Sequence, residues 1–454
     1  IYMSEYAPIT LLDYILLPIF LGFIYGIAYS YRNRHYKKNH PWRKYFIPAL
    51  SVKIVGAIFI GMVYYYYYTE GDTIDYFHHG QIINSAINES FGKWINLLFH
   101  IPDRSNGEYY AYFSQLHFYK DPPSYMVGTV SALLNLFTLN SYLPTAVLFA
   151  AISFTGIWAL FRTFASLLPQ LLRPVALAIL FIPSVFVWGS GIFKDTICIF
   201  GIGWLTYSCF RFLLKGDFSI RNIAIATGSF LLISLVKLYI IMAFTPALLM
   251  WIFFNYTQKI TNPATKIAVK FFFIVIVIAA TAFFLQQFSS SLGKYSIDSI
   301  AETAKTTREY LNWISGDEGS AYSLGDFDPS ITGMLVKFPQ AVNVTFFRPY
   351  PWEAKKVIVL LSAIEAILFL YITLKTLFVI GLRKTWTTIS KDPTIQFCLI
   401  FSIIFAFAVG ISSYNFGTLS RYKIPCLPFY ALAIILIWYK NKPLKQKLIR
   451  PLNI

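Results

Sequence analysis

The sequence predicts an all-α, polytopic membrane protein in which all 454 residues form one integral membrane domain. Three observations predict this fold class. Hydrophobic residues make up 57% of the chain, charged residues make up only 13%, and the mean hydropathy is +0.57. A water-soluble domain of this length could not bury so much apolar surface. Apolar runs long enough to cross about 30 Å of hydrocarbon recur along the chain, and each must be helical to satisfy its own backbone.

These apolar runs predict about 11 transmembrane helices. A further apolar stretch at 124–139 is short and follows two prolines, which favours a re-entrant or interfacial helix over a complete crossing. The spans are expected at 9–30, 46–68, 142–162, 174–189, 193–212, 222–236, 239–254, 266–285, 357–380, 396–412 and 425–439.

The distribution of charge predicts the orientation. Segment 31–45 carries six Lys or Arg residues and no acid, and the tail from Lys440 onward carries five. Because Lys and Arg are enriched in cytoplasmic loops, the C-terminus should be cytoplasmic and the N-terminus outside. Two long outer loops, 69–123 and 286–356, then hold 15 of the 21 acidic residues. The net charge of +17 is therefore mainly a topological signal that also favours anionic lipid, and nucleic-acid motifs are absent.

The second outer loop contains an amphipathic piece at 298–314, followed by a Gly/Ser/Asp-rich stretch. This composition is typical of a docked helix beside a mobile lid. The cysteines lie in or beside apolar segments without close pairing, so we expect small core residues and not disulfides or zinc ligands. They are Cys198, Cys209, Cys398 and Cys426.

An acidic, histidine-containing motif follows the second predicted span. From 64 to 80 the chain reads YYYYYTEGDTIDYFHHG and delivers Glu70, Asp72, Asp75, His78 and His79. Carboxylates and imidazoles gathered at a membrane boundary indicate chemistry or ion handling there.

Helical spacing places Asp72, Asp75 and His79 on one face of a short helix. We expect this helix to lie flat on the outer surface, with Tyr76 and Phe77 turned toward the bilayer. A carboxylate at this place can act as general base on a sugar or alcohol hydroxyl. The two carboxylates and the imidazole could instead hold a divalent cation, Mg²⁺ or Mn²⁺. The structural alternative is a solvated helix N-terminus, where the helix dipole favours acids.

Two lysines lie where an anion is expected. In GSGIFKDT, residues 189–196, Lys194 and Asp195 start a helix after a glycine turn, a position suited to a lipid phosphate. Lys237 interrupts an apolar run, which costs about 2.5 to 3.5 kcal/mol unless the charge is paired or hydrated. The alternatives are a Lys-Asp pair that caps the helix and a lysine that extends toward the membrane surface.

Two further motifs place cations beside prolines at the outer ends of helices. They are FFRPYPWE, with Arg348 and Glu353, and NFGTLSRYKIP, with Arg421 and Lys423. An arginine held against proline and aromatic residues suits bidentate phosphate recognition, whereas ordinary interfacial anchoring explains a lysine equally well. Glu365, an acid within a predicted span, is expected to be hydrogen-bonded inside the helix bundle.

This layout resembles the GT-C superfamily of polytopic glycosyltransferases, which use polyprenyl-phosphate-linked sugars. The shared features are Glu70-Gly71-Asp72 followed by Tyr76, a second long outer loop, and basic residues at outer helix ends. The SGxxKD and GTxxRYKxPxxPF elements are also similar to bacterial polysaccharide-polymerase-like membrane proteins. In the GT-C families the acid of the GD-x-x-x-Y element serves as base or metal ligand, a role that the resemblance gives to Asp72, with Asp75 as the second candidate.

The resemblance implies glycosyl transfer from a polyprenyl-phosphate-linked sugar to a glycan, lipid or protein acceptor. It implies the non-cytoplasmic face of a membrane, which we expect to be a bacterial inner membrane. Lys194, Arg348 and Arg421 would then hold the lipid phosphate, with Lys237 and Lys423 as further candidates. A carboxylate would activate the acceptor hydroxyl, and cations would stabilise the leaving phosphate.

Two other functions fit the same composition. A non-catalytic subunit of an envelope complex would bind protein partners through the outer loops. A transporter or flippase of lipid-linked glycans would also have basic rim residues, but it should show interrupted helices with paired charges near the midplane and internal repeats. No convincing repeat is present in the sequence.

Overall fold

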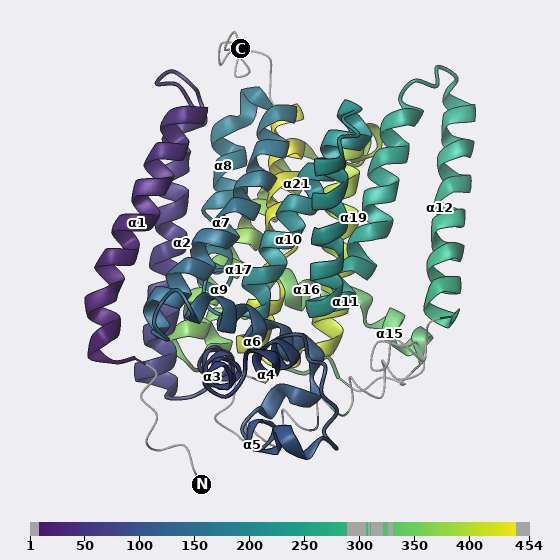
Figure 1. The fold of residues 1–454 in the computed structure, drawn as a ribbon. Coiled ribbons are helices and arrows are strands. Elements are labelled where there is room, and N and C mark those ends of the chain that lie inside the picture. Colours follow the sequence, from purple (N-terminus) through teal and green to yellow (C-terminus); the bar gives the residue numbers. More distant parts are fainter. Residues whose placement is uncertain (1–8, 288–305, 307–308, 310–320, 326–329, 442–454) are drawn as a thin grey trace. The chain divides into compact units, whose positions relative to one another are not determined.

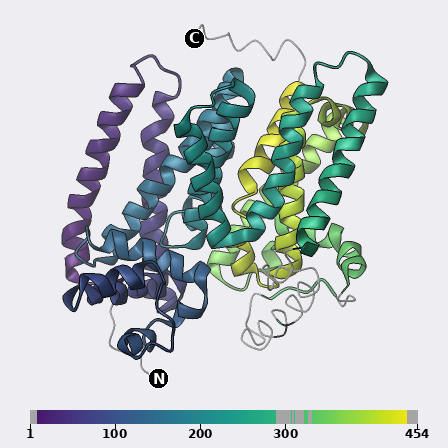
Figure 2. The same ribbon diagram turned by 45° about the vertical axis from the view of Figure 1, so that its right-hand side comes forward.

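The computed structural model describes residues 9–287, 306, 309, 321–325 and 330–441. Over these residues the chain is helical and has no strand, apart from one isolated bridge between Ala321 and Asn415 (Figure 1, Figure 2). The prediction of an all-α fold is confirmed for the described part of the chain. The predicted lid and most of the amphipathic piece at 298–314 lie outside the described residues.

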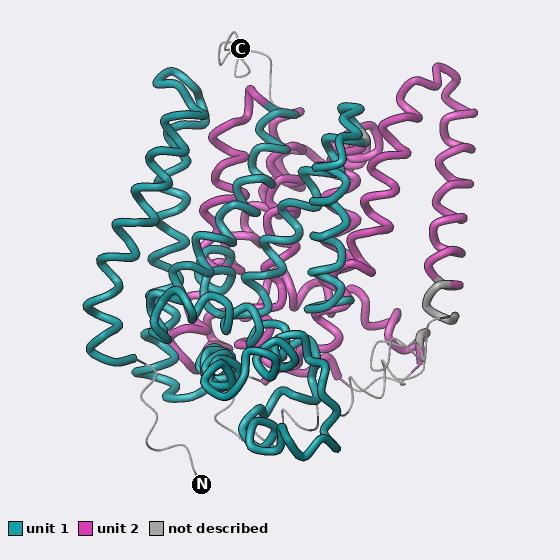
Figure 3. The backbone as a smooth tube through the Cα atoms, viewed as in Figure 1, with its two compact units in different colours: residues 1–168, 185–238 teal, residues 169–184, 239–454 magenta. Residues whose placement is uncertain are grey.

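Two compact units divide the chain (Figure 3). Unit 1 comprises residues 1–168 and 185–238, and unit 2 comprises 169–184 and 239–454. Short helix α9 (Pro183–Trp188) and long helix α11 (Ile220–Thr257) each contain a unit boundary. The other named helices of unit 1 are α1 (Leu11–His35), α2 (Arg43–Val63), α3 (Asp72–Ser85), α4 (Phe91–Leu98), α5 (Tyr110–Phe113), α6 (Pro122–Asn135), α7 (Tyr142–Leu167) and α10 (Lys194–Cys209).

The remaining helices belong to unit 2, where α16, α17, α19 and α21 pack against one another. Prolines stand in the first turn of α16, α19 and α21, where their missing N–H groups are not needed. The helices are α8 (Leu172–Leu180), α12 (Pro263–Gln287), α15 (Ile331–Val336), α16 (Phe338–Phe347), α17 (Val357–Ile380), α18 (Leu382–Lys391), α19 (Pro393–Ser412), α20 (Phe416–Tyr422) and α21 (Leu427–Lys440).

Seven helices in the described part of the chain are long and apolar enough to cross a membrane, or eight if the pair α20 and α21, bent by 69°, is one span. They identify the chain as an integral membrane protein. The seven are Leu11–His35, Arg43–Tyr68, Tyr142–Leu167, Ile220–Thr257, Pro263–Thr281, Val357–Ile380 and Pro393–Ser412.

The predicted count of about 11 spans is not confirmed. Helices α8 and α10 occupy two of the predicted segments, but neither is among the seven. Helix α8 has 9 residues and reaches about 14 Å at 1.5 Å per residue, less than the ~30 Å hydrocarbon core. Helix α10 has 16 residues and continues into a π-helical turn, Phe210–Leu214. Helix α11 is broken at Lys237, where the backbone is not helical, and this break lies between the two predicted spans 222–236 and 239–254. The helix in the 124–139 region, α6, has 14 residues and is also too short to cross.

In unit 1, helices α3 to α6 gather at one end of α1, α2 and α7 (Figure 1, Figure 2). The basic connection between α1 and α2 lies at the opposite end. Unit 1 therefore separates the acid-rich segment 69–123 from the Lys- and Arg-rich segment 31–45, as the predicted orientation requires.

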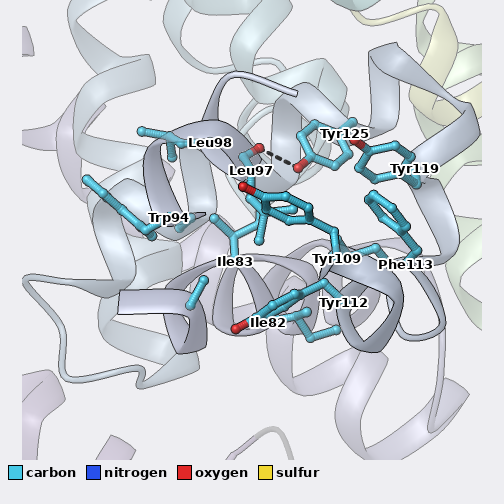
Figure 4. Packing of buried hydrophobic residues seen from close by; sticks show 13 residues of the cluster. Ile82, Ile83, Trp94, Leu97, Leu98, Tyr109, Tyr112, Phe113, Tyr119 and Tyr125 are labelled. Carbon is cyan, nitrogen blue, oxygen red and sulfur yellow. Dashed lines mark hydrogen bonds between the residues drawn. The ribbon is translucent and has the colours of Figure 1, made fainter. Parts of the chain in front are cut away.

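A core of aromatic and aliphatic side chains holds α3 to α6 together (Figure 4). Trp94 and Tyr125 each tie the core to a polar partner, because the indole N–H donates to Asn84 Oδ1 (3.0 Å) and the phenol donates to the Leu97 carbonyl (2.5 Å). Burying side chains of this size contributes about 1.5 to 3 kcal/mol each. Segment 69–123 is therefore a folded layer that can hold functional groups in fixed positions.

Buried acids at helix starts stabilise both units. In unit 1, Asp13 is 1% exposed, and its carboxylate accepts hydrogen bonds from the Leu143 backbone N–H (2.8 Å) at the start of α7 and from Thr10. In unit 2, Glu365 accepts from the backbone N–H (2.9 Å) and hydroxyl (2.6 Å) of Ser184. Free N–H groups at a helix start favour an anion. The expectation that Glu365 is hydrogen-bonded inside the bundle is confirmed.

Candidate functional site

The acidic motif starts helix α3 through a glycine that no other residue replaces without strain. The π-helical turn Tyr64–Tyr68 ends at Thr69, and Gly71 then adopts a φ of 125°. A Cβ atom at Gly71 would lie 2.7 Å from Cε1 of Tyr64. The Gly71 carbonyl accepts a hydrogen bond from the backbone N–H of Asp75 (3.2 Å). This hydrogen bond forms the first turn of α3, which begins directly after Gly71. Both Asp72 and Asp75 therefore stand in the first turn, at the positive end of the helix dipole.

Contacts with α6 and α7 fix the position of α3. The hydroxyls of Thr73 and Tyr142 are 2.7 Å apart, and the Asn84 amide donates to the Ala132 carbonyl (2.7 Å). Gly80 allows close packing, because a Cβ atom there would lie 2.6 Å from the Ala132 nitrogen. The side chains on α3 are therefore held on a rigid element.

The expectation that Tyr76 and Phe77 face the bilayer is wrong. Tyr76 is 3% exposed and Phe77 is fully buried within the protein. Their rings pack against Phe118 and Tyr142, with centroid distances of 5.2 and 5.3 Å. The prediction failed because it treated α3 as an isolated surface helix, whereas Phe118 covers Tyr76 and Tyr142 of α7 covers Phe77.

Asp75 is a carboxyl group of the motif whose ionisation is altered. Its side chain is half-buried, and this burial, together with the neighbouring Asp72 carboxylate, raises the pKa of Asp75 to about 6. His117 opposes the shift, and the exposed Glu70 adds to it. A carboxyl group that changes ionisation near neutral pH is suited to general base chemistry.

Lys194 brings a cation to the same site. It is the first residue of α10, and its Nζ lies 3.3 Å from Oδ2 of Asp121. The Asp72 carboxylate and the Lys237 ammonium also act electrostatically on Lys194. The side chains of Lys194 and Asp121 are 20% and 44% exposed. Pairs of this kind contribute at most about 1 kcal/mol, so Lys194 can exchange Asp121 for another anion at small cost.

Asp195, the residue after Lys194, forms a buried ion pair with Lys237. Nζ of Lys237 lies 2.5 Å from Oδ1 of Asp195, and the side chains are 6% and 0% exposed. The anion expected beside Lys237 is therefore Asp195. At Lys237 the backbone leaves the helical conformation, with φ of −148° and ψ of 81°, so this pair lies at a break in α11.

The two histidines of the motif have different surroundings. His78 is half-buried, and its Nδ1 lies 3.5 Å from Oε1 of Gln81. His79 is 2% exposed and packs with Phe118 and Tyr125, and burial lowers the pKa of His79 to about 3. It is therefore neutral at physiological pH.

A search of the described part of the chain finds no group of three or more His, Cys, Asp or Glu residues placed to hold a metal ion. Coordination of Mg²⁺ or Mn²⁺ by Asp72, Asp75 and His79 stays a prediction. The buried His79 fills space between aromatic rings.

Lys53 is a site residue that sequence reasoning missed. It is 2% exposed, and its Nζ donates to Oγ of Ser153 (3.0 Å) and to the carbonyl of Gly189. Ser153 Oγ also lies 3.2 Å from the Gly189 carbonyl. Because the buried turn after Gly189 leads directly to Lys194, Lys53 fixes the turn that positions this cation. Lys53 is the one charged residue in apolar run 46–68, a signal that marks it for attention.

The predicted cations of unit 2 form their own contacts. The guanidinium of Arg348 is paired with Glu353, with Nε at 3.1 and 3.0 Å from the two carboxylate oxygens. Although burial opposes it, this hydrogen bonding holds the pKa of Glu353 below its usual value. Arg348 also lies 5.4 Å from the ring centroid of Phe416. The guanidinium donors that were expected to bind a phosphate therefore already bind the Glu353 carboxylate.

Arg421 and Lys423 lie at the bend between α20 and α21. Arg421 is half-buried in the last turn of α20. Lys423 is 1% exposed, and the Glu365 carboxylate acts on it electrostatically. Unit 1 thus brings together Asp72, Asp75, Lys194, Asp195 and Lys237, while Arg348, Arg421 and Lys423 belong to unit 2.

No protein-family model, curated protein or solved structure matches this chain. The resemblance to GT-C glycosyltransferases therefore rests on the sequence motifs alone. A function has to be argued from the groups that unit 1 brings together.

Proposed function

We propose that this protein is a membrane glycosyltransferase that moves a sugar from a polyprenyl-phosphate donor to a hydroxyl acceptor at the non-cytoplasmic face. One observation carries this proposal. Asp75, with its pKa of about 6, lies within electrostatic reach of Asp72, and Asp72 in turn acts on Lys194. In glycosyl transfer from a lipid phosphate, a base can activate the acceptor and a cation can stabilise the leaving phosphate.

The proposed reaction uses Asp75 as the base. Its carboxylate takes the proton of the acceptor hydroxyl while the hydroxyl oxygen forms a bond to the anomeric carbon of the donor sugar. The bond between this carbon and the phosphate oxygen breaks, and polyprenyl phosphate leaves with the electron pair. Lys194 stabilises the charge that develops on this phosphate.

The motif alone suggested Asp72 as the first candidate for the base and Asp75 as the second, and the proposal reverses this order. Asp72 instead raises the pKa of Asp75 and interacts with Lys194. It acts as a positioning residue between base and cation. Asp195 and the buried Lys237 support the start of α10, from which Lys194 projects.

The proposal includes an orientation. The outer side is the side of helices α3 to α6, in a membrane that we take to be a bacterial inner membrane. The N-terminus is then outside and the C-terminus is cytoplasmic. The opposite placement of the acidic and basic segments within unit 1 supports this orientation (Figure 1).

The activity test uses the purified full chain in lipid nanodiscs with a polyprenyl-phosphate sugar and an oligosaccharide acceptor. We expect release of polyprenyl phosphate together with glycosylated acceptor. Lys194→Met should raise the KM for the donor about tenfold or more, because the phosphate loses its cation. Lys93→Met is the matched control, since Lys93 forms a solvent-exposed pair with Glu89 in the same segment. Equal KM values for the two variants would contradict the role of Lys194.

Transport of a lipid-linked glycan is the second candidate function, and one observation favours it. Helix α11 is interrupted at buried Lys237, and the helix pair α20 and α21 is bent by 69° beside buried Lys423. Interrupted helices with buried charges are typical of transporters. Sided uptake of the lipid-linked sugar into liposomes without release of polyprenyl phosphate would favour transport. Neither uptake nor release would favour a non-catalytic subunit.

A further inference from the structure

We propose that a groove in unit 1 binds one anionic phospholipid, with an acyl chain between α1, α2, α7 and α10 and the phosphate at Arg162. This inference is independent of the proposed glycosyl transfer. It concerns the opposite end of unit 1 from Asp72 and Asp75, beside the basic connection between α1 and α2.

The groove has a volume of about 470 Å³ and an almost entirely apolar wall. It exists because α1 uses a narrow stripe to contact the rest of unit 1. Ile24 and Ala28 are buried in this stripe, while Phe23 and Ile27 remain 65% and 55% exposed and line the groove. An apolar chain would cover these side chains without moving α1.

The dimensions suit an acyl chain. The residues of α7 that line the groove run from Leu148 to Arg162, a length of about 21 Å at 1.5 Å per residue. One leaflet of the hydrocarbon core is about 15 Å deep. A helix of about 20 residues and ~10 Å diameter would occupy roughly 2,000 Å³, which is much more than the groove offers. The groove therefore fits a single chain and not a helix of a second protein.

Arg162 supplies a cation at one end of this apolar wall. Its guanidinium donates to the hydroxyl of Tyr207 and lies 4.4 Å from the centroid of that ring. Within the described residues, no carboxylate lies within ion-pair distance of Arg162. The tyrosine holds the guanidinium in place but leaves its charge without an anionic partner. A phosphate group offers such a partner and suits the planar donors of arginine.

One further contact places the Arg162 end of the groove at the level of lipid head groups. Midway along the groove, the Trp204 indole N–H donates to the hydroxyl of Thr155 (3.1 Å), so these two polar groups of the wall satisfy each other. Trp158, also in the wall, donates to the hydroxyl of Tyr36 (2.8 Å), and Tyr36 lies in the basic segment 31–45. Tryptophan and tyrosine are typical of membrane interfaces, and a basic segment favours anionic lipid over zwitterionic lipid.

The test measures lipid binding to the purified full chain by native mass spectrometry. Delipidated protein is titrated with phosphatidylglycerol or with phosphatidylcholine that carries the same acyl chains. We expect one phosphatidylglycerol to bind at least tenfold more tightly than phosphatidylcholine. Arg162→Gln should abolish this preference, whereas Arg221→Gln, which removes an exposed arginine of unit 1, should keep it.

A second variant tests the groove itself. Ala151→Phe fills part of the apolar wall and should weaken binding of both lipids, while its thermal transition reports whether the chain still folds. If it does not fold, Thr155→Val removes the hydroxyl midway along the wall at nearly constant volume and should keep acyl-chain binding. Equal binding of the two lipids, unchanged preference in Arg162→Gln, or displacement of phosphatidylglycerol by equimolar polyprenyl phosphate would overturn the proposal. Dimers without bound lipid would also overturn it.

Discussion

At the scale of single residues, the two aspartates of α3 have different properties although they stand in the same helical turn. Asp75 is half-buried, so its carboxyl group is protonated at a higher pH than usual. The charge of Asp72 contributes to this shift. In the proposed mechanism Asp75 accepts the proton, and the charge of Asp72 raises the affinity of Asp75 for that proton.

The first prediction concerns the pH dependence of transfer. A general base works in its deprotonated form, so kcat/KM should rise as the pH passes about 6, the pKa of Asp75. Asp72→Asn removes a negative charge and should move this rise toward lower pH. Glu70→Gln should produce a smaller shift in the same direction, because Glu70 contributes less to the pKa of Asp75. A pH profile that is flat from 5 to 8 would rule out Asp75 as the base.

The second prediction concerns Lys53 as a positioning residue. Lys53→Met removes a donor to the Gly189 carbonyl, so the turn before Lys194 should relax and kcat/KM should fall. Ser153→Ala should affect the same turn, because Ser153 contacts both Lys53 and Gly189. Residues in contact show coupling energies of about 0.5 to 3 kcal/mol, so a double-mutant cycle on kcat/KM should be non-additive.

The control for this cycle combines Lys53→Met with Lys93→Met, since Lys93 lies in an exposed pair with Glu89. These effects should add within about 0.5 kcal/mol. Additivity in the Lys53 and Ser153 cycle would show that the buried lysine does not act through the turn.

At the scale of helices, close packing of α3 on α6 decides where the two aspartates point. Gly80 makes this packing possible, because any Cβ atom at this position would meet the Ala132 nitrogen at 2.6 Å. The contact lies about one and a half helical turns from Asp75. A shift of α3 would therefore move the proposed base relative to Lys194.

The third prediction follows from this contact. Gly80→Ala should destabilise the protein by about 1 to 3 kcal/mol through overpacking, and it should reduce the rate of sugar transfer. Gly107→Ala is the control, because a Cβ atom at Gly107 meets nothing within 4 Å. Thermal unfolding and transfer rate should both remain close to wild type in the control. Equal behaviour of the two variants would show that the spacing of α3 and α6 is unimportant.

The helices also show what periodicity can predict. Long apolar runs such as 357–380 and 396–412 correspond to single helices, α17 and α19. For apolar runs 174–189 and 193–212 the number and length of the helices were harder to predict, because burial inside a protein and burial in lipid favour the same residues. Length separates the two cases only when the helix ends are known. Proline and glycine at 183 and 189–191 divide these runs into α8, α9 and α10.

At the scale of the whole molecule, the predicted orientation rests on the separation of charge along the chain. The fourth prediction tests it by labelling with a membrane-impermeant maleimide. Arg104→Cys should react in intact cells, whereas Lys38→Cys should react only after the membrane is opened. The four native cysteines are buried and should contribute little background. Labelling of both variants from the same side would contradict the orientation.

The fold class and the acidic motif could be predicted because their signals are local in the sequence. The partners of the charged residues could not. Asp121 lies 73 residues from Lys194, and Ser153 lies 100 residues from Lys53. Such pairs depend on which helices pack together, and apolar periodicity alone does not specify this. For the same reason the burial of Tyr76 and Phe77 was missed.

The most direct test of the proposed function is the rate of polyprenyl phosphate release by Asp75→Asn in folded, purified protein. We predict a loss of about 10² to 10⁴-fold, the usual contribution of a general base. Glu108→Gln, which neutralises an exposed acid of the same segment, 69–123, should retain the wild-type rate. Full activity in Asp75→Asn would contradict the assignment of the base, and full activity in both Asp75→Asn and Asp72→Asn would contradict the site as a whole.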